Sequence, residues 1–241
     1  MLAELLRGQQ PCVVLTGAGV STESGIPDFR SPTGIWRRYD PREYATIDAF
    51  RRDPERVWDF YGRRLDVLAR AEPNVGHRAL ARLEHEGLVE AVVTQNVDGL
   101  HRAAGSREVI EVHGSLERAV CPRCGTCVGR EELARLLEQG APPCPRCGAI
   151  AKPGVVMFGE LLPERAIDRA TDLARRARLM LVVGSSLEVW PVAGLPQETL
   201  AAGGRLAIVN REPTPYDERA SLVVRGSAGE ALERAVEALA A

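Results

Sequence analysis

The chain has 241 residues, about one and a half average domains, which predicts one large domain with a smaller attached module rather than two equal domains. Hydrophobic residues make up 45 % of the chain and charged residues 27 %, a composition that excludes general disorder. The 31 basic and 33 acidic side chains nearly cancel, and the sequence has neither a long apolar run nor a signal-peptide pattern. We therefore expect a cytoplasmic protein that binds neither nucleic acid nor a membrane surface.

Short apolar runs alternate with helical patterns along the chain. The first run, Cys12 to Leu15, is too short for a helix and leads into Thr16-Gly17-Ala18-Gly19, which is typical of a buried parallel strand followed by a glycine-rich loop. Similar runs predict strands at 89–94, 179–184 and 205–210, with a fifth at 221–225, and helices at 75–86 and 163–176. This alternation predicts an α/β fold with a doubly wound, parallel, Rossmann-like sheet.

Two regions depart from that rhythm. Residues 48–70 look helical and predict a cap, within about 29–72, rather than a helix that covers the sheet. Residues 116–153 hold five of the six cysteines among short polar turns, which indicates an inserted module. The predicted organisation is a Rossmann-like domain at 1–115 and 154–241, interrupted by this module.

Four cysteines of the insert have the spacing of a zinc ribbon. Cys121 and Cys124 are separated by two residues, as are Cys144 and Cys147, and each pair lies in a Cys-Pro-Arg-Cys-Gly repeat. A segment with so few apolar side chains needs a bound metal to fold, so we expect one structural zinc ion. Two disulfides are the alternative, which a reducing compartment disfavours. Cys127 could replace one ligand, although the paired repeats favour a site without it.

The loop after the first strand carries part of a dinucleotide fingerprint. Gly17 and Gly19 would let phosphate oxygens approach backbone N–H groups. Thr22 stands where the third glycine of the fingerprint is expected. Taken alone, the loop is equally well explained as a tight turn.

Longer motifs extend the pattern over nearly the whole chain. They are TGAGVSTESGIPDFR at 16–30, TQNVDGLH at 94–101, VHG at 112–114, VVMFGE at 155–160, GSS at 184–186 and VN at 209–210. With these motifs in this order, the chain resembles the sirtuins, the NAD-dependent protein lysine deacylases. The resemblance implies NAD as co-substrate, one structural zinc ion, and acylated lysine side chains of proteins as partners.

The resemblance also implies a reaction. The acyl-lysine amide oxygen attacks C1′ of the nicotinamide ribose, nicotinamide leaves, and the ribose 2′-hydroxyl attacks the resulting imidate. The products are free lysine, nicotinamide and O-acyl-ADP-ribose. His113 matches the base that activates this hydroxyl, and histidine has a suitable pKa, although a histidine beside a glycine turn is often structural. We expect His77 and His85 to be surface residues and His101 to pack locally.

The implied NAD contacts follow the ends of the predicted strands, where ligands of open α/β sheets bind. Asn96 would orient a water or ribose hydroxyl as a second catalytic residue, and Asp98 would bind the nicotinamide carboxamide, although Asp98-Gly99 also reads as a turn. Phe29 would shield the reacting ribose from water. The implied NAD-binding set is Gly17, Ala18, Gly19, Asp28, Phe29, Arg30, Trp36, Gln95, Asn96, Asp98, Gly184, Ser185, Ser186, Asn210 and Ala228.

The acylated peptide is expected to pair with a strand at 155–160, through Val156, Phe158, Gly159 and Glu160. Tyr61 and Arg64 lie three residues apart on a predicted helix, and sirtuins that prefer succinyl- or malonyl-lysine carry this pair with an alanine where Ala45 stands. A carboxylate at the acyl tip would bind both side chains. The alternatives are a core tyrosine and a surface arginine, and residues 26–30 look more like the deacetylase branches.

Rival functions remain at this point. They are a plain deacetylase, a mono-ADP-ribosyltransferase, and a noncatalytic NAD-binding module whose zinc ribbon contacts nucleic acid. The missing third glycine and the cysteine insert argue against a dehydrogenase. The sequence leaves the oligomeric state open, with a monomer as the simplest expectation.

Overall fold

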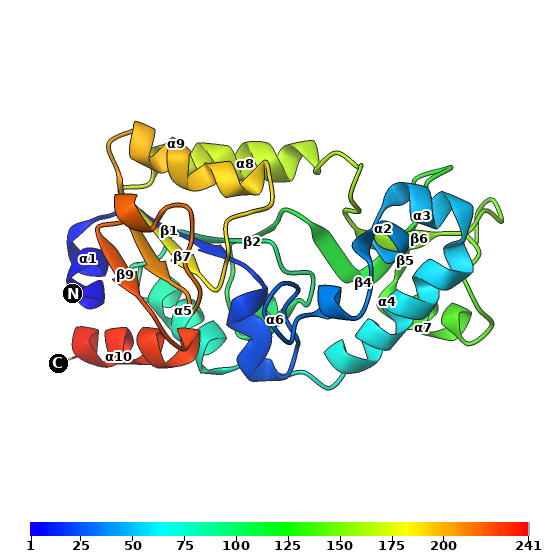
Figure 1. Ribbon diagram of the computed structural model, residues 1–241, viewed down its shortest axis with the longest axis horizontal. Coiled ribbons are helices and arrows are strands. Elements are labelled where there is room, and N and C mark those ends of the chain that lie inside the picture. Colours follow the sequence, from blue (N-terminus) through cyan, green and yellow to red (C-terminus); the bar gives the residue numbers. More distant parts are fainter. Residues whose placement is uncertain (241) are drawn as a thin grey trace.

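The computed structural model describes residues 1–240, which form a large and a small lobe (Figure 1). The large lobe is built on six parallel strands in the order β3-β2-β1-β7-β8-β9. Their bounds are β1 Cys12–Thr16, β2 Ala91–Thr94, β3 Val109–Glu111, β7 Leu179–Val183, β8 Arg205–Val209 and β9 Leu222–Val224. The doubly wound Rossmann-like sheet is therefore confirmed, with β3 as a strand that the sequence did not reveal. Strand order reverses between β1 and β7, and ligands of such sheets bind at this switch point.

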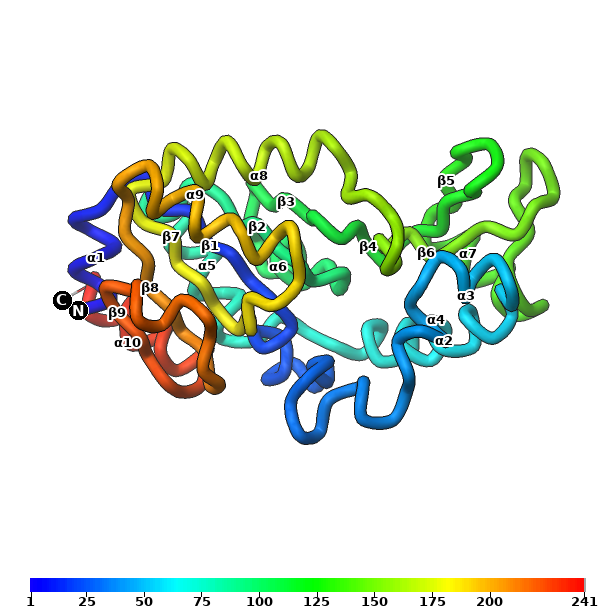
Figure 2. The backbone as a smooth tube through the Cα atoms, turned by 45° about the horizontal axis from the view of Figure 1, so that its top comes forward, coloured from blue at the N-terminus to red at the C-terminus, as the bar shows by residue number. Residues whose placement is uncertain are grey.

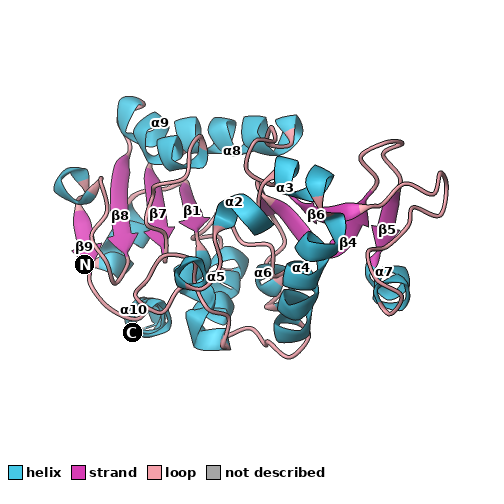
Figure 3. Cartoon of the chain, turned by 45° about the vertical axis from the view of Figure 1, so that its right-hand side comes forward, coloured by secondary structure: helices cyan, strands magenta, loops and turns pink. Residues whose placement is uncertain are grey.

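Helices cover both faces of the sheet (Figures 1 and 3). One face packs against α1 (Leu2–Gly8), α5 (Val75–His85) and α10 (Ala228–Ala240). The other face packs against α8 (Glu164–Arg176) and α9 (Leu195–Ala201). Neighbouring strand residues alternate between the two cores, Val14 facing the first and Val13 the second. Burial on both faces explains why these strands appear in the sequence as continuous apolar runs.

The small lobe joins the cysteine module to the cap. Its antiparallel sheet has the order β5-β4-β6 and lies beside the helix α7. These elements are β4 Gly114–Val120, β5 Cys127–Gly129, β6 Lys152–Val155 and α7 Arg130–Leu137. The cap consists of α2 Pro41–Tyr44, α3 Ile47–Arg52 and α4 Pro54–Leu68. Figure 2 shows both parts at the end of the molecule opposite the two termini.

A single hydrophobic core holds these two parts together. Val57, Trp58 and Phe60 of α4 pack with Leu116 and Val128 of the module. The Trp58 indole also donates a hydrogen bond of 2.8 Å to the Ala151 carbonyl. The cap and the module are thus rigidly joined, although they are far apart in sequence.

Two predicted elements differ from the structure. The single helical segment predicted at 48–70 is broken at Asp53, whose side chain accepts from the Arg56 amide as the N-cap of α4, with Pro54 in the first turn. The strand predicted over 155–160 is wrong beyond Val155, where β6 ends. Gly159 there has a φ of 89°, which belongs to a turn. Within residues 1–240, no helix combines the length and apolarity needed to cross a membrane.

Two short helical elements of the large lobe remain, α6 (Leu100–Ala103) and the 3-10 turn η1 (Ala18–Ser24). Further 3-10 turns occur at Ile35–Arg37, Val192–Gly194 and Asp217–Arg219. The turn η1 follows β1 directly, so the glycine-rich loop leads into a 3-10 turn rather than a regular helix.

Candidate active site

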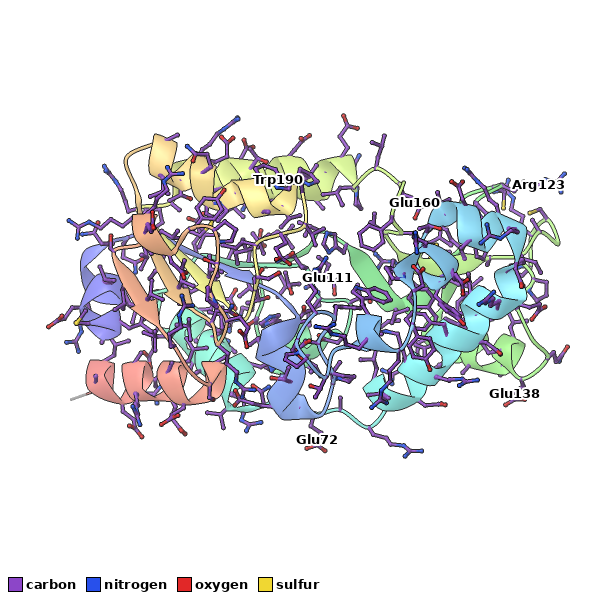
Figure 4. All side chains as sticks on the ribbon, in the orientation of Figure 1. Glu72, Glu111, Arg123, Glu138, Glu160 and Trp190 are labelled. Atoms are coloured by element: carbon purple, nitrogen blue, oxygen red, sulfur yellow. The ribbon has the colours of Figure 1, made fainter. Side chains whose placement is uncertain are left out.

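A cavity of about 990 Å³ lies between the two lobes, at the carboxyl ends of β1, β2, β7 and β8. It is large enough for a dinucleotide-sized ligand. Figure 4 labels two residues of its rim, Glu160 on the link to the small lobe and Trp190 on the loop after β7, and Trp190 is 70 % exposed. Every residue predicted for the active site lines this cavity except Ala228, which is buried at the start of α10.

Glycines let the loops after β1 and β7 approach each other closely. The Gly19 amide donates to the Gly184 carbonyl at 2.8 Å. A Cβ on Gly17 or Gly19 would come within 2.9 or 2.8 Å of that carbonyl oxygen, and one on Gly184 would come 2.2 Å from the Val20 nitrogen. Gly184 also has a φ of 61°, which disfavours any other residue. The loops therefore form a side-chain-free cradle that suits the diphosphate of a dinucleotide.

Asn96 is oriented by hydrogen bonds and is 8 % exposed. Its amide nitrogen donates to the Gly17 carbonyl and to the Ser21 hydroxyl, both at 3.1 Å. The side-chain carbonyl oxygen makes no hydrogen bond with residues 1–240, so it can accept one from a ligand in the cavity. Ser21, which the sequence reasoning did not select, donates in turn to Asp98 at 2.7 Å.

The geometry of Asp98 is compatible with both of its predicted roles, a turn with Gly99 and contact with a ligand. One carboxylate oxygen accepts from Ser21 and the other from the Leu100 amide at 3.0 Å. Gly99 follows with a φ of 72° as the N-cap of α6, so the predicted turn is present. Asp98 also lines the cavity, so it can contact a ligand there.

His77 corrects one expectation, because it is fully buried rather than on the surface. It lies on the inner face of α5, where its ring closes a capping box with Asn74, a spacing of three residues that could have been recognised in the sequence. Because the Nδ1 of His77 accepts from the Asn74 amide, its Nε2 carries the proton and points to Ser21 at 3.4 Å. Burial lowers the pKa of His77 to about 4, so the ring is neutral at pH 7.

The other two histidines outside the site behave as expected. His85 is exposed. His101 is buried, and its Nε2 lies 2.9 Å from the Thr16 hydroxyl, which itself donates to Thr94. Burial lowers the pKa of His101 to about 3. His101 is therefore a neutral packing residue.

His113 occupies the link between β3 and β4 and faces the cavity. Its Nδ1 lies 3.1 Å from the Gln95 carbonyl oxygen, which can only accept, so Nδ1 holds the proton. The lone pair of the neutral ring is then on Nε2. Burial lowers the pKa of His113, and the bond to Gln95 opposes this in part. The ring is consequently a neutral, oriented proton acceptor near pH 7.

The loop of residues 27–37, called the Phe29 loop below, covers one side of the cavity. Asp28 caps its turn by accepting from the Arg30 and Ser31 amides. Arg30 forms an ion pair of 3.1 Å with Glu188, a residue after β7 that the sequence reasoning also missed. Both side chains are largely exposed, so this pair contributes little stability.

Ala45, Tyr61 and Arg64 enter the cavity from the cap. Tyr61 is buried, and this burial raises its pKa to about 12. Arg64 is half-buried and not a surface arginine, and it forms no ion pair or hydrogen bond with residues 1–240. Its guanidinium carbon lies 4.9 Å from the centre of the Phe29 ring. Burial lowers the pKa of Arg64, while Tyr61 and Asp98 oppose this through space.

The link from β6 to α8 closes the cavity beside the cap. Phe158 donates its amide to Ala45 and accepts from the Ile47 amide, at 2.9 and 3.0 Å. An ion pair of 3.1 Å between Glu160 and Lys152, both mostly buried, holds the turn that follows. Val156 donates to the His113 carbonyl at 2.8 Å, which ties this link to the candidate base.

The four predicted zinc ligands lie together in the small lobe. The ligand atoms of Cys121, Cys124, Cys144 and Cys147 are all within 4.8 Å of one another, and two Sγ pairs are 3.5 and 3.6 Å apart. A tetrahedral zinc ion with Zn–S bonds of about 2.3 Å separates its sulfurs by about 3.8 Å, so the cluster fits one ion. These separations exclude disulfides. Cys127 is exposed on β5 and is not part of the cluster.

Comparison with known proteins agrees with this geometry. The model of the Sir2 family matches residues 17–191. An NAD-dependent protein deacylase 2 from Pyrobaculum aerophilum is 47 % identical over 98 % of this chain and 94 % of its own length. An NAD-dependent protein deacetylase from Caldivirga maquilingensis is 48 % identical over 96 % of this chain and 90 % of its own length.

Solved structures give the same result. A complex of Sir2 with a p53 peptide and NAD⁺ superposes with a TM-score of 0.90 at 42 % identity, covering 98 % of this chain and 96 % of that one. An ADP-ribose complex of a Sir2 homologue superposes with a TM-score of 0.95 at 41 % identity, covering 99 % and 95 %. From its motifs, its cavity and these matches, the chain belongs to the Sir2 family, the sirtuins.

Proposed function

We propose that this protein is an NAD-dependent protein lysine deacylase that forms nicotinamide, O-acyl-ADP-ribose and free lysine. The observation that carries this proposal is the position of His113. It is a neutral base, held by the Gln95 carbonyl, in the cavity at the switch point of the sheet. The NAD-dependent relatives and the Sir2 complex with NAD⁺ and a peptide support it.

The bound NAD supplies an electrophilic ribose carbon and nicotinamide as the leaving group. The glycine cradle, Ser185 and Ser186 hold the diphosphate, and Asn210 and Ala228 hold the adenosine. Ala228 starts α10 and does not line the cavity itself, so its part in holding the adenosine would be indirect. Gln95 and Asp98, which follow β2 and line the cavity, would hold the nicotinamide ring and its ribose.

The side chains around the reacting ribose have different roles in the reaction. The free carbonyl oxygen of Asn96 orients a ribose hydroxyl or a water and stabilises developing positive charge. His113 takes the 2′-hydroxyl proton at Nε2 while the Gln95 carbonyl stabilises the proton on Nδ1. Phe29 and Trp36 exclude water above the ribose, and Arg30 reaches the phosphates once it leaves Glu188.

The acylated peptide lies along residues 156–160. The Phe158 backbone is already bonded to the cap through Ala45 and Ile47, so the peptide would use backbone groups without a partner among residues 1–240, the Gly159 amide and the Val156 carbonyl. Hydrogen bonds between main chains at this place discriminate little between different peptide sequences. Glu160 keeps the turn in shape through Lys152.

The acyl pocket accepts acidic acyl groups, such as succinyl and malonyl, as well as acetyl. Arg64 supports this finer proposal, because a half-buried guanidinium without an ion pair among residues 1–240 is completed by a ligand carboxylate. Tyr61 lies beside it as a second donor, and the small Ala45 leaves room for a longer chain.

Two kinetic comparisons test the proposal. Nicotinamide release from NAD is expected with an acetyl-lysine peptide and not with the unmodified peptide, whereas release that ignores the peptide would indicate ADP-ribosyl transfer or hydrolysis. With a succinyl-lysine peptide, Arg64→Met should lower kcat/KM about tenfold to a hundredfold more than with the acetyl peptide. Arg63→Met, which changes an exposed arginine of the same helix, is the matched control. If Arg64→Met lowers kcat/KM equally for both peptides, Arg64 does not recognise the acyl carboxylate and the protein is a plain deacetylase.

The remaining expectations concern the setting of the reaction. We propose that the protein acts as a monomer in the cytoplasm on lysine side chains of other proteins, without binding nucleic acid. The near balance of 31 basic and 33 acidic side chains supports the expectation that it does not bind nucleic acid.

A further inference from the structure

Aromatic contacts join the Phe29 loop to the cap helix α4. The rings of Phe29 and Trp36 lie 5.2 Å apart, and Trp36 stacks on Phe60 of α4 at 6.0 Å with an interplanar angle of 18°. Arg64, one turn after Phe60, places its guanidinium carbon 4.9 Å from the Phe29 ring centre and 5.9 Å from that of Phe60. The arginine therefore bridges the loop and the helix.

Tyr61 and Asp98 act on the Arg64 charge through space, and the two rings are its contacts among residues 1–240, because it has no ion pair or hydrogen bond there. Guanidinium groups gain most from cation–π contacts where water is partly excluded, as it is at this half-buried position. The contact with Phe29 therefore stabilises both the arginine and the loop.

A guanidinium group can make two kinds of contact at once. Its face stacks on aromatic rings, while its edge presents coplanar N–H donors that match a carboxylate. In this cavity the guanidinium carbon of Arg64 lies over the rings of Phe29 and Phe60, and its N–H groups are free of protein partners among residues 1–240. An acyl carboxylate on that edge would fix the guanidinium without displacing the rings.

We propose that Arg64 is a positioning residue that holds Phe29 over the reacting ribose, and that an acidic acyl group tightens the Phe29 loop through the same guanidinium. The inference rests on the proposed function and extends it. Its consequence is a choice between two fates of NAD. When the loop opens, water attacks C1′, the bond from C1′ to the nicotinamide nitrogen breaks with its electron pair leaving on nicotinamide, and the water proton passes to solvent. Arg64 thus favours deacylation over this hydrolysis.

Hydrogen exchange in the protein without ligands measures the loop directly. The Ile35 and Trp36 amides are bonded to the Asp28 and Phe29 carbonyls at 2.9 and 3.1 Å, so their exchange reports opening of the loop. In Arg64→Met we expect exchange about threefold to thirtyfold faster, equivalent to about 0.7 to 2 kcal/mol at 1.4 kcal/mol per factor of ten.

Two further variants separate positioning from general effects. Arg64→Lys keeps the charge but loses the planar guanidinium group, so it should fall between wild type and Arg64→Met. Arg63→Met removes an exposed charge from the neighbouring position and should leave loop exchange unchanged. Equal acceleration in Arg63→Met and Arg64→Met, or none in Arg64→Met, would overturn the proposal.

The second readout is the ratio of NAD hydrolysis to deacylation with an acetyl-lysine peptide. Acetyl has no carboxylate, so a higher ratio in Arg64→Met reports the loop and not a lost acyl contact. An unchanged ratio contradicts the inference. If the wild type deacylates no peptide at all, the proposed function fails, while the exchange experiment still decides whether Arg64 holds the loop.

Discussion

We predict that acid destabilises this protein steeply below pH 6.5, because two buried histidines must stay neutral in the folded state. Burial lowers the pKa of His77 to about 4 and that of His101 to about 3, and their rings lie 4.8 Å apart. Asp98 and Glu23 favour a proton on His77 through space, and Arg78 opposes it. In the unfolded chain both rings have a pKa of about 6.5, so the unfolded state takes up protons first as the pH falls.

The sign and size of the effect follow from this difference. The free energy of unfolding that the two neutral histidines contribute is fully present above pH 6.5. It is lost as the pH falls toward their folded-state pKa values of about 4 and about 3. At about pH 5 the linkage relation gives a loss of about 2 kcal/mol for each histidine, or about 4 kcal/mol together. For a chain of this size the midpoint of thermal unfolding should fall on the order of 10 °C. Glu111, whose pKa burial raises, acts in the opposite direction.

The assay compares His101→Gln with wild type by thermal unfolding with excess zinc, at about pH 7.5 and about pH 5. Glutamine can still donate to Thr16 but does not titrate. We expect the variant to lose about 2 kcal/mol less stability than wild type between these values. His85→Gln, at an exposed histidine, should behave like wild type. If His101→Gln loses as much stability as wild type, the account of the buried histidines is refuted.

Three further substitutions test the site and the small lobe. His113→Ala should lower deacylation about a hundredfold to ten-thousandfold with an unchanged fold and nearly unchanged NAD affinity by calorimetry, and substantial turnover would contradict the role as base. Cys144→Ser, or removal of zinc by a chelator, should unfold the small lobe and abolish activity, so full activity in a compact metal-free protein would exclude a structural zinc site. Gly184→Ala should weaken NAD binding and lower the midpoint of thermal unfolding, because its Cβ would lie 2.2 Å from the Val20 nitrogen; unchanged binding would show that the cradle is unnecessary.

The sheet was predictable because its strands are buried on both faces. Each central strand is a continuous apolar run, so four strands could be found near their true bounds, and β9 also. Of the five helices that cover the sheet, two were predicted, α5 and α8. The strand β3 is only three residues long, too short for a pattern. The break between α3 and α4 was signalled by Asp53-Pro54 and could have been recognised as a cap.

The arrangement of the site depended on information that a sequence pattern does not carry. The spacing of the cysteines was sufficient for the zinc cluster, because the ligand pairs lie in local turns. The burial of His77 was not predicted, because its helix is rich in charged residues. His77 lies on the inner face of this helix, where it contacts Ser21. The contact between Arg64 and Phe29 joins positions far apart in sequence, and it arises only when the cap folds over the cavity.

The stoichiometry of the products distinguishes lysine deacylation from ADP-ribosyl transfer and from hydrolysis of NAD. The protein is incubated with NAD and an acetyl-lysine peptide, and nicotinamide, free-lysine peptide and acyl-ADP-ribose are quantified together by mass spectrometry. We expect equal amounts of all three, with the acyl group on the ADP-ribose. A peptide that keeps its acyl group and gains the mass of ADP-ribose, or free ADP-ribose with an unchanged peptide, would contradict it.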